Sequence, residues 1–183
     1  MKQDLLTTTF VLVLAGLGMA TASDLPPSKQ SSLGLYLSSR EAAGLLSAEP
    51  SALMIDVRTP EEIDETGIAE DVDALIPLAL LNGSNGLAFN PDFYPGFLRL
   101  VSERNIATDT PIVLICRSGN RSAQAVNALA SLGFTRVYTV TDGFEGDRAK
   151  DGRRTVNGWK NAGLPWRKQR ASDCAPAIEG GAC

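Results

Sequence analysis

The chain has 183 residues, of which 44% are hydrophobic and 21% charged, as is typical of one compact globular domain with its own core. Its net charge of -4 argues against nucleic acid as a partner, because neutralising phosphates requires a basic face. The sequence has no histidine, which excludes a Ser-His-Asp triad, a Cys-His protease and a histidine-ligated metal site, and its three cysteines are too few for a four-cysteine zinc site.

The first 22 residues are typical of an export signal. Lys2 precedes the apolar run Leu5–Met19, and Ala20–Ala22 forms a cleavage site of small residues. The alternative is an uncleaved membrane anchor, but the run is shorter than the roughly 20 residues of a membrane-spanning helix, and no basic cluster follows it. We therefore expect cleavage after Ala22, export to the periplasm, and no stable membrane insertion of the mature chain.

The segment after the signal, residues 23–32, is rich in serine and proline and predicts a flexible lead into a domain over residues 33–168. Ser38 and Glu41 have the spacing of a capping box, which predicts a helix to about Ser47.

Predicted strands and helices then alternate along the chain. Strands are predicted at residues 52–57, 74–78, 111–115 and 136–140, and helices at residues 59–67, 96–105 and 120–132. Residues 81–95, rich in glycine, asparagine and proline, are predicted as a loop. This order predicts an α/β fold in which a parallel central sheet has helices on both faces. Ligands bind beyond the carboxyl ends of the strands in such sheets, and Cys116 directly follows one of them.

Cys116 begins a short polar loop between a buried strand and a helix. Such a loop turns its N–H groups inward beside the positive end of the helix dipole, which stabilises a thiolate. Arg117 and Arg121 add to this effect and are also candidates for binding an anionic substrate, while Gly119 allows backbone angles that a side chain forbids. The alternative is a buried structural cysteine before an ordinary basic turn. The loop as a whole favours a reactive nucleophile.

The loop Cys116–Ser122, together with residues 53–58 and 158–165, resembles the rhodanese family of sulfurtransferases over about residues 33–166. The resemblance implies a rhodanese-like three-layer fold. It also implies a cysteine that takes sulfane sulfur from thiosulfate or a related small sulfur-containing anion and holds it as a persulfide. The sulfur then passes to a thiol, a protein or cyanide, and no metal or organic cofactor is needed.

By position, the resemblance makes Cys116 the persulfide carrier. The backbone cradle around the sulfur is then formed by Arg117, Ser118, Gly119, Asn120, Arg121 and Ser122. The side chains of Arg117 and Arg121 are candidates for binding the sulfonate end of thiosulfate. Asp56 and Arg58 match positions that brace the loop in the family.

Two features depart from the family pattern. Where rhodaneses often have Gly-His-Ile-Pro-Gly-Ala, this chain retains only Ile76–Pro77. Residues 142–155 are longer than the usual connection, and we expect a surface loop there, with part of a pocket rim as the alternative.

Two other functions are alternatives to sulfur transfer. A cysteine phosphatase or arsenate reductase is disfavoured, because phosphatases place an arginine at the sixth position after the cysteine to clamp phosphate, and Ser122 stands there. A non-enzymatic sulfur carrier or sensor would instead bind a partner protein, with Phe89, Phe93 and Tyr94 as its docking surface if they are exposed.

Cys174 and Cys183 lie in a tail of small residues, 169–183. In an oxidising compartment we expect them to form a local disulfide. The alternative is that one of them is a relay thiol that accepts sulfur from Cys116.

Overall fold

The computed structural model describes residues 22–83, 86–174 and 183. The predicted export signal therefore lies almost wholly outside the described residues. Within them, no helix combines the length and the hydropathy that crossing a membrane requires.

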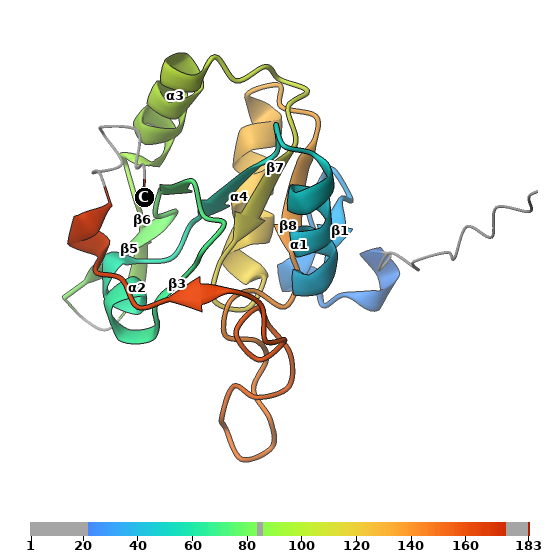
Figure 1. Cartoon of the computed structure of the whole chain (residues 1–183), viewed down its shortest axis with the longest axis vertical. Helices are drawn as coiled ribbons and strands as arrows, with labels where there is room; N and C mark the ends of the chain where they lie inside the picture. The colour runs from blue at the N-terminus through green and yellow to red at the C-terminus, as the bar shows by residue number, and fades with distance from the viewer. Residues whose placement is uncertain (1–21, 84–85, 175–182) are drawn as a thin grey trace, which may run out of the picture.

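A parallel sheet of five strands, in the order β1-β8-β7-β2-β4, forms the centre of the described part of the chain (Figure 1). Its strands are β1 (Tyr36–Leu37), β2 (Leu53–Asp56), β4 (Ala74–Leu75), β7 (Ile112–Ile115) and β8 (Val137–Val140). The central pair, β2 and β7, is in register from Leu53 opposite Ile112 to Asp56 opposite Ile115. The predicted α/β fold with a parallel sheet is confirmed. The short edge strand β1 has no counterpart among the predicted elements.

Helices cover both faces of this sheet. They are α1 (Ser39–Ala48), α2 (Pro60–Thr66), α3 (Phe93–Arg104) and α4 (Asn120–Ser131). Along β7 the side chains alternate between two buried clusters: Ile112 and Leu114 pack with α3 and α4, and Val113 and Ile115 pack with α1 and α2. Cys116 continues the first set, so its side chain lies on the α3 and α4 side of the sheet.

Capping boxes begin the two helices on the other face, and the one at Ser38 and Glu41 was predicted. The Ser38 hydroxyl accepts the Glu41 N–H and the Thr59 hydroxyl accepts the Glu62 N–H, while each glutamate accepts the N–H of its capping residue. Helix α2 ends at Gly67, whose φ of 87° is costly for a residue with a side chain.

Residues 81–95, predicted as a loop, contain regular structure. The strands β5 (Ala79–Asn82) and β6 (Gly86–Phe89) form an antiparallel hairpin, and α3 begins at Phe93 rather than near Gly96. Pro95 lies within the first turn of α3, where an N–H has no partner inside the helix, so proline does not delay the start of the helix. The prediction gave the glycine and proline content too much weight.

The segment 23–32, expected as a flexible lead, contacts the domain. The 3-10 helix Pro27–Lys29 packs against α4, and the Lys29 ammonium forms an ion pair of 2.7 Å with Asp147. The Ser32 N–H donates to the side chain of Asn127 at 2.7 Å. These partners lie about a hundred positions away in the sequence, so local composition could not predict them.

The C-terminal end of the domain also packs onto the α1 and α2 side. Trp159 is fully buried there, and β9 (Trp166–Arg167) pairs antiparallel with β3 (Ile68–Ala69). The 3-10 helix Ala171–Asp173 contacts α2.

Candidate active site

Cys116 is the free cysteine of the structure and lies where β7 ends and the loop to α4 begins. Its side chain is buried, and its Sγ accepts the N–H of Gly119 at 3.2 Å. Gly119 has a φ of 94°, and a Cβ at this position would lie 2.2 Å from the Thr141 carbonyl oxygen. The tight turn that aims an N–H at the sulfur therefore requires glycine here.

Ser122 holds the far side of the loop. Its hydroxyl donates to the Gly119 carbonyl at 3.1 Å, accepts a hydrogen bond from Thr139 at 2.8 Å, and lies 3.5 Å from the Cys116 Sγ. Ser122 and Thr139 are fully buried. The single Ser122 proton can be directed to the carbonyl or to the sulfur, so the hydroxyl can act as a second donor to a thiolate. A small side chain, not a guanidinium, thus lies beneath the loop at the sixth position.

Residues 143–146, directly after the turn that follows β8, support the loop from behind. The N–H groups of Phe144 and Glu145 donate to the carbonyls of Cys116 and Arg117 at 2.7 and 3.0 Å. Asp142 fixes this turn by accepting the Ser39 N–H at 2.8 Å and the Gly158 N–H at 2.9 Å. Sequence analysis missed this support, although the Asp-Gly pair at 142–143, after a predicted strand, is a turn signal that could have indicated it.

Gly143 is predicted to be essential for the shape of the loop. Its φ is 64°, and a Cβ there would lie 2.5 Å from the Ser118 nitrogen and 2.6 Å from the Cys116 carbonyl oxygen. We expect Gly143→Ala to displace the loop and to lower any activity that depends on Cys116 at least about tenfold, because small displacements of reacting groups are costly. The matched control is Gly163→Ala: its φ of 72° is similar, but a Cβ would meet no described atom within 4 Å. Equal kinetic losses in the two variants would contradict the prediction.

Asp56 and Arg58 form a fully buried ion pair, with 2.7 Å between Arg58 Nη2 and Asp56 Oδ2. Arg58 also donates to the Thr66 hydroxyl and the Gly67 carbonyl, both at 2.9 Å. Its guanidinium lies 4.1 Å from the centre of the Phe144 ring. Since the Phe144 N–H supports Cys116, this pair reaches the loop through Phe144.

Arg121, a candidate for binding an anionic substrate, has a protein partner. Both of its terminal nitrogens donate to the Glu62 carboxylate at 2.6 Å, which ties α4 to α2. The sequence did not indicate this pair, because Glu62 lies 59 positions upstream, on another helix. Arg121 also lines a cavity of about 290 Å³ together with Leu78, Ala79, Leu87, Phe89 and Gln124. Because Arg121 belongs to the loop Cys116–Ser122, this partly apolar cavity borders that loop.

The Glu62–Arg121 pair should make the free energy of unfolding depend on pH. Although burial raises the pKa of Glu62, hydrogen bonds and charge from Arg121 outweigh burial and lower it below its usual value. The stabilisation is therefore complete above the unfolded-state pKa of about 4.3 and is lost as the pH falls through the folded-state value. We expect Glu62→Gln to lower the free energy of unfolding at pH 7 by about 1.5–3 kcal/mol, a difference that shrinks below about pH 4.

Urea unfolding at several pH values measures this difference. Glu61→Gln, which alters an exposed carboxylate on the same helical turn, is the control and should change stability little. A loss in Glu62→Gln that is the same at pH 3 and pH 7 would contradict the assignment.

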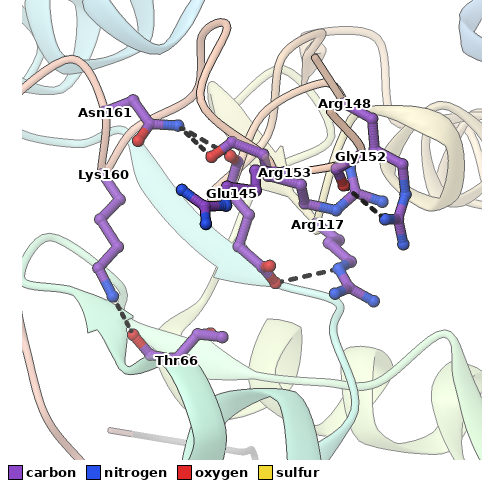
Figure 2. Close-up of a pocket in the computed structure, with 9 residues that line it drawn as sticks. Thr66, Arg117, Glu145, Arg148, Gly152, Arg153, Lys160 and Asn161 are labelled. Atoms are coloured by element: carbon purple, nitrogen blue, oxygen red, sulfur yellow. Dashed lines mark hydrogen bonds and ion pairs between the residues drawn. The ribbon is translucent and has the colours of Figure 1, made fainter. Parts of the chain in front are cut away.

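Arg117 lines a different cavity from Arg121. Its Nε lies 3.1 Å from the Glu145 carboxylate, and both side chains line a second cavity of about 430 Å³ (Figure 2). Its other walls come mainly from residues 148–161. Residues 142–155 were expected to be a surface loop. The structure supports the alternative, a pocket rim, because part of this segment surrounds the Arg117 side chain.

The tail cysteines lie away from Cys116. Cys174 and Cys183 are joined by a disulfide, and both pack into the cluster on the α1 and α2 face. Cys116 belongs to the cluster on the opposite face. The structure therefore does not bring the tail cysteines and Cys116 together.

The three aromatic residues considered as a docking surface differ in exposure. Phe93 is buried and Tyr94 half-buried, and only the Phe89 side chain, at 55% exposed, is open to solvent. Phe93 lies inside because it begins α3 and faces the sheet. A docking surface made of all three residues is therefore wrong.

Comparison with known proteins identifies the family. Residues 38–150 match the family model for the rhodanese-like domain. The chain belongs to the rhodanese-like domain family. Over 129 residues it is 35% identical to an uncharacterised protein of Rickettsia prowazekii, a match that covers 70% of this chain and 94% of the relative. It is also 32% identical to the chloroplastic thiosulfate sulfurtransferase 16 of Arabidopsis thaliana, over 61% of this chain and 76% of that protein.

Solved structures agree with this membership. The crystal structure of the Rv0390 protein of M. tuberculosis is similar with a TM-score of 0.59 at 32% identity, covering 73% of this chain and 97% of that one. The solution structure of the polysulfide-sulfur transferase homodimer of Wolinella succinogenes has a TM-score of 0.50 at 22% identity, over 78% and 82% of the two chains. The second likeness supports the fold of this rhodanese-like domain alone. The resemblance to the rhodanese family that was inferred from the sequence is confirmed.

Proposed function

We propose that this rhodanese-like protein is a sulfurtransferase that moves sulfane sulfur through a persulfide on Cys116. The observation that carries the proposal is the arrangement around the thiol: the Gly119 N–H points at Sγ, and the Ser122 hydroxyl lies 3.5 Å away. Two donors near one sulfur can stabilise the negative charge that it carries during sulfur transfer. Relatives named thiosulfate sulfurtransferases support the same chemistry.

The proposed reaction has two balanced steps. The Cys116 thiolate attacks the outer sulfur of thiosulfate, the bond between the two thiosulfate sulfurs breaks, and sulfite leaves with its electron pair. A thiolate or cyanide then attacks the terminal sulfur of the persulfide. This second step releases a new persulfide or thiocyanate and regenerates the Cys116 thiolate. No metal or organic cofactor takes part.

We further propose that the protein works after export, in the periplasm. The export signal predicted at residues 1–22 supports this location. The disulfide between Cys174 and Cys183 is consistent with an oxidising compartment. The small anionic donor and the thiol or protein acceptor are proposed from membership of the rhodanese-like family.

Mass spectrometry tests the proposal directly. After thiosulfate treatment, the intact protein should gain one sulfur atom, peptide mapping should place it on Cys116, and one equivalent of sulfite should appear in solution. The variant Cys116→Ser should gain no sulfur. An equal mass gain in the variant, or no gain in the wild type, would overturn the proposal.

A sulfur carrier that binds a partner protein is the second candidate. The hairpin of β5 and β6 favours it, because Leu81, Leu87 and Phe89 are about half exposed there. Leu87 and Phe89 also line the same cavity as Arg121 of the active loop. Rapid thiosulfate-to-cyanide turnover would favour the enzyme. Stoichiometric loading of Cys116 without turnover would favour the carrier.

A further inference from the structure

The cavity beside Arg117 concentrates positive charge in an acidic protein. It is lined by Thr66, Arg117, Glu145, Arg148, Gly152, Arg153, Arg154, Lys160 and Asn161 (Figure 2). Five of these side chains are cationic and one is a carboxylate, whereas the whole chain has a net charge of -4. Such a local reversal of sign raises the local concentration of anions.

Three cations of this cavity are held in place by backbone carbonyls rather than by carboxylates. Arg148 donates to the Gly152 carbonyl at 2.7 Å, Arg154 donates to the Gly146 carbonyl, and Lys160 donates to the Thr66 carbonyl at 3.0 Å. A backbone carbonyl fixes the position of a guanidinium or ammonium but carries no net charge.

Two further observations concern the surroundings of Arg154 and Lys160. The Nε of Arg154 is buried and has no hydrogen-bond acceptor among the described residues. Burial, followed by the positive charges of Arg117 and Arg148, lowers the pKa of Arg154. Burial also lowers the pKa of Lys160, and the charge of Lys168 lowers it further. A bound anion would offset the repulsion among these like charges.

We propose that this cavity is a binding site for a small organic anion that bears two or more acidic groups. Its volume of about 430 Å³ is in the range of small-molecule sites and exceeds what an oxyanion of a few atoms fills. Several separated cations match several acidic groups, and arginine binds carboxylates through paired hydrogen bonds.

The site is distinct from the thiol but adjoins the active loop. Cys116 does not line the cavity, whereas Arg117, the next residue, does. Arg117 is the cation whose charge is opposed within the cavity, by Glu145 at 3.1 Å. An anion in the site therefore competes with Glu145 for Arg117.

Calorimetric titration tests the proposal with citrate as the probe and the full-length Cys116→Ser variant as the protein. This variant cannot carry sulfur, so the outcome is independent of the proposed sulfur transfer. At low ionic strength we expect citrate to bind with a dissociation constant below about 1 mM and acetate to bind at least about tenfold more weakly. Amide NMR shifts on citrate addition should be confined to residues near 145–161 and Arg117.

Substitutions in the same background assign the binding to the cavity. Arg153→Gln, which removes an exposed cation, and Arg148→Gln should each weaken citrate binding by about three- to tenfold. Glu145→Gln should strengthen it by a similar factor, because it removes the competing carboxylate. Arg99→Gln, on the exposed side of α3, is the matched control and should leave binding unchanged. No binding at about 10 mM citrate, or equal weakening by Arg99→Gln, would overturn the proposal.

Discussion

Replacing Cys116 with serine should abolish sulfur transfer while leaving the fold intact. Serine is close in size to cysteine and can still accept the Gly119 N–H, so the loop geometry should be retained. A serine oxygen cannot form a persulfide, and the transfer has no other route through the protein. We expect the rate of thiosulfate-to-cyanide transfer to fall at least about a thousandfold.

Steady-state kinetics and a urea unfolding curve, measured on the same preparation, check this result. The double variant Cys174→Ser/Cys183→Ser is the control, because it removes the two other cysteines and keeps Cys116. It lacks a disulfide on the opposite face and should lose stability but keep most of its turnover at a temperature where it is folded. Transfer that survives Cys116→Ser, or that disappears in a folded tail variant, would contradict the assignment.

Replacing Arg58 with methionine should cause the largest loss of stability among the charge-removing substitutions considered for the described residues. Arg58 and Asp56 are both fully buried, and the change leaves the Asp56 carboxylate in the core without its partner. Removing one member of a buried pair costs about 3–5 kcal/mol in the free energy of unfolding. Because Arg58 also contacts Phe144, which supports the loop, sulfur transfer should fall in the folded fraction as well.

Urea unfolding with a matched pair of variants tests this prediction. Arg104→Met breaks the 2.9 Å ion pair between Arg104 and Asp73, two side chains that are each about one-third exposed. It should lower the free energy of unfolding by at most about 1 kcal/mol. The double variant Asp56→Asn/Arg58→Met should recover part of the loss, because no uncompensated charge remains. Similar losses in Arg58→Met and Arg104→Met would show that the buried pair contributes little.

These predictions describe a loop that is supported from two sides. Ser122 and Thr139 hold it from beneath, and Phe144 and Glu145 hold it from behind. The Arg58 guanidinium fixes Phe144 in turn. The reactive sulfur therefore depends on residues from three strand ends, which is the usual place for a site in a parallel sheet.

Much of this molecule follows from the sequence by itself. Apolar runs of strand length, separated by capped helices, predict the parallel sheet, because each signal lies within a few residues of the structure it specifies. Cys116, Gly119 and Ser122 could be predicted for the same reason: a strand, a tight turn and a helix are local features. The family resemblance added the sulfur chemistry.

Only the tertiary structure decided how charges and distant segments are paired. It pairs Arg121 with Glu62, places Arg117 in a basic cavity, and packs residues 143–146 against the loop. It also packed the lead segment on α4 and set the tail disulfide on the face opposite Cys116. An arginine pairs with a residue that the fold brings within hydrogen-bond distance. That proximity cannot be read from the composition or from the spacing of residues along the sequence.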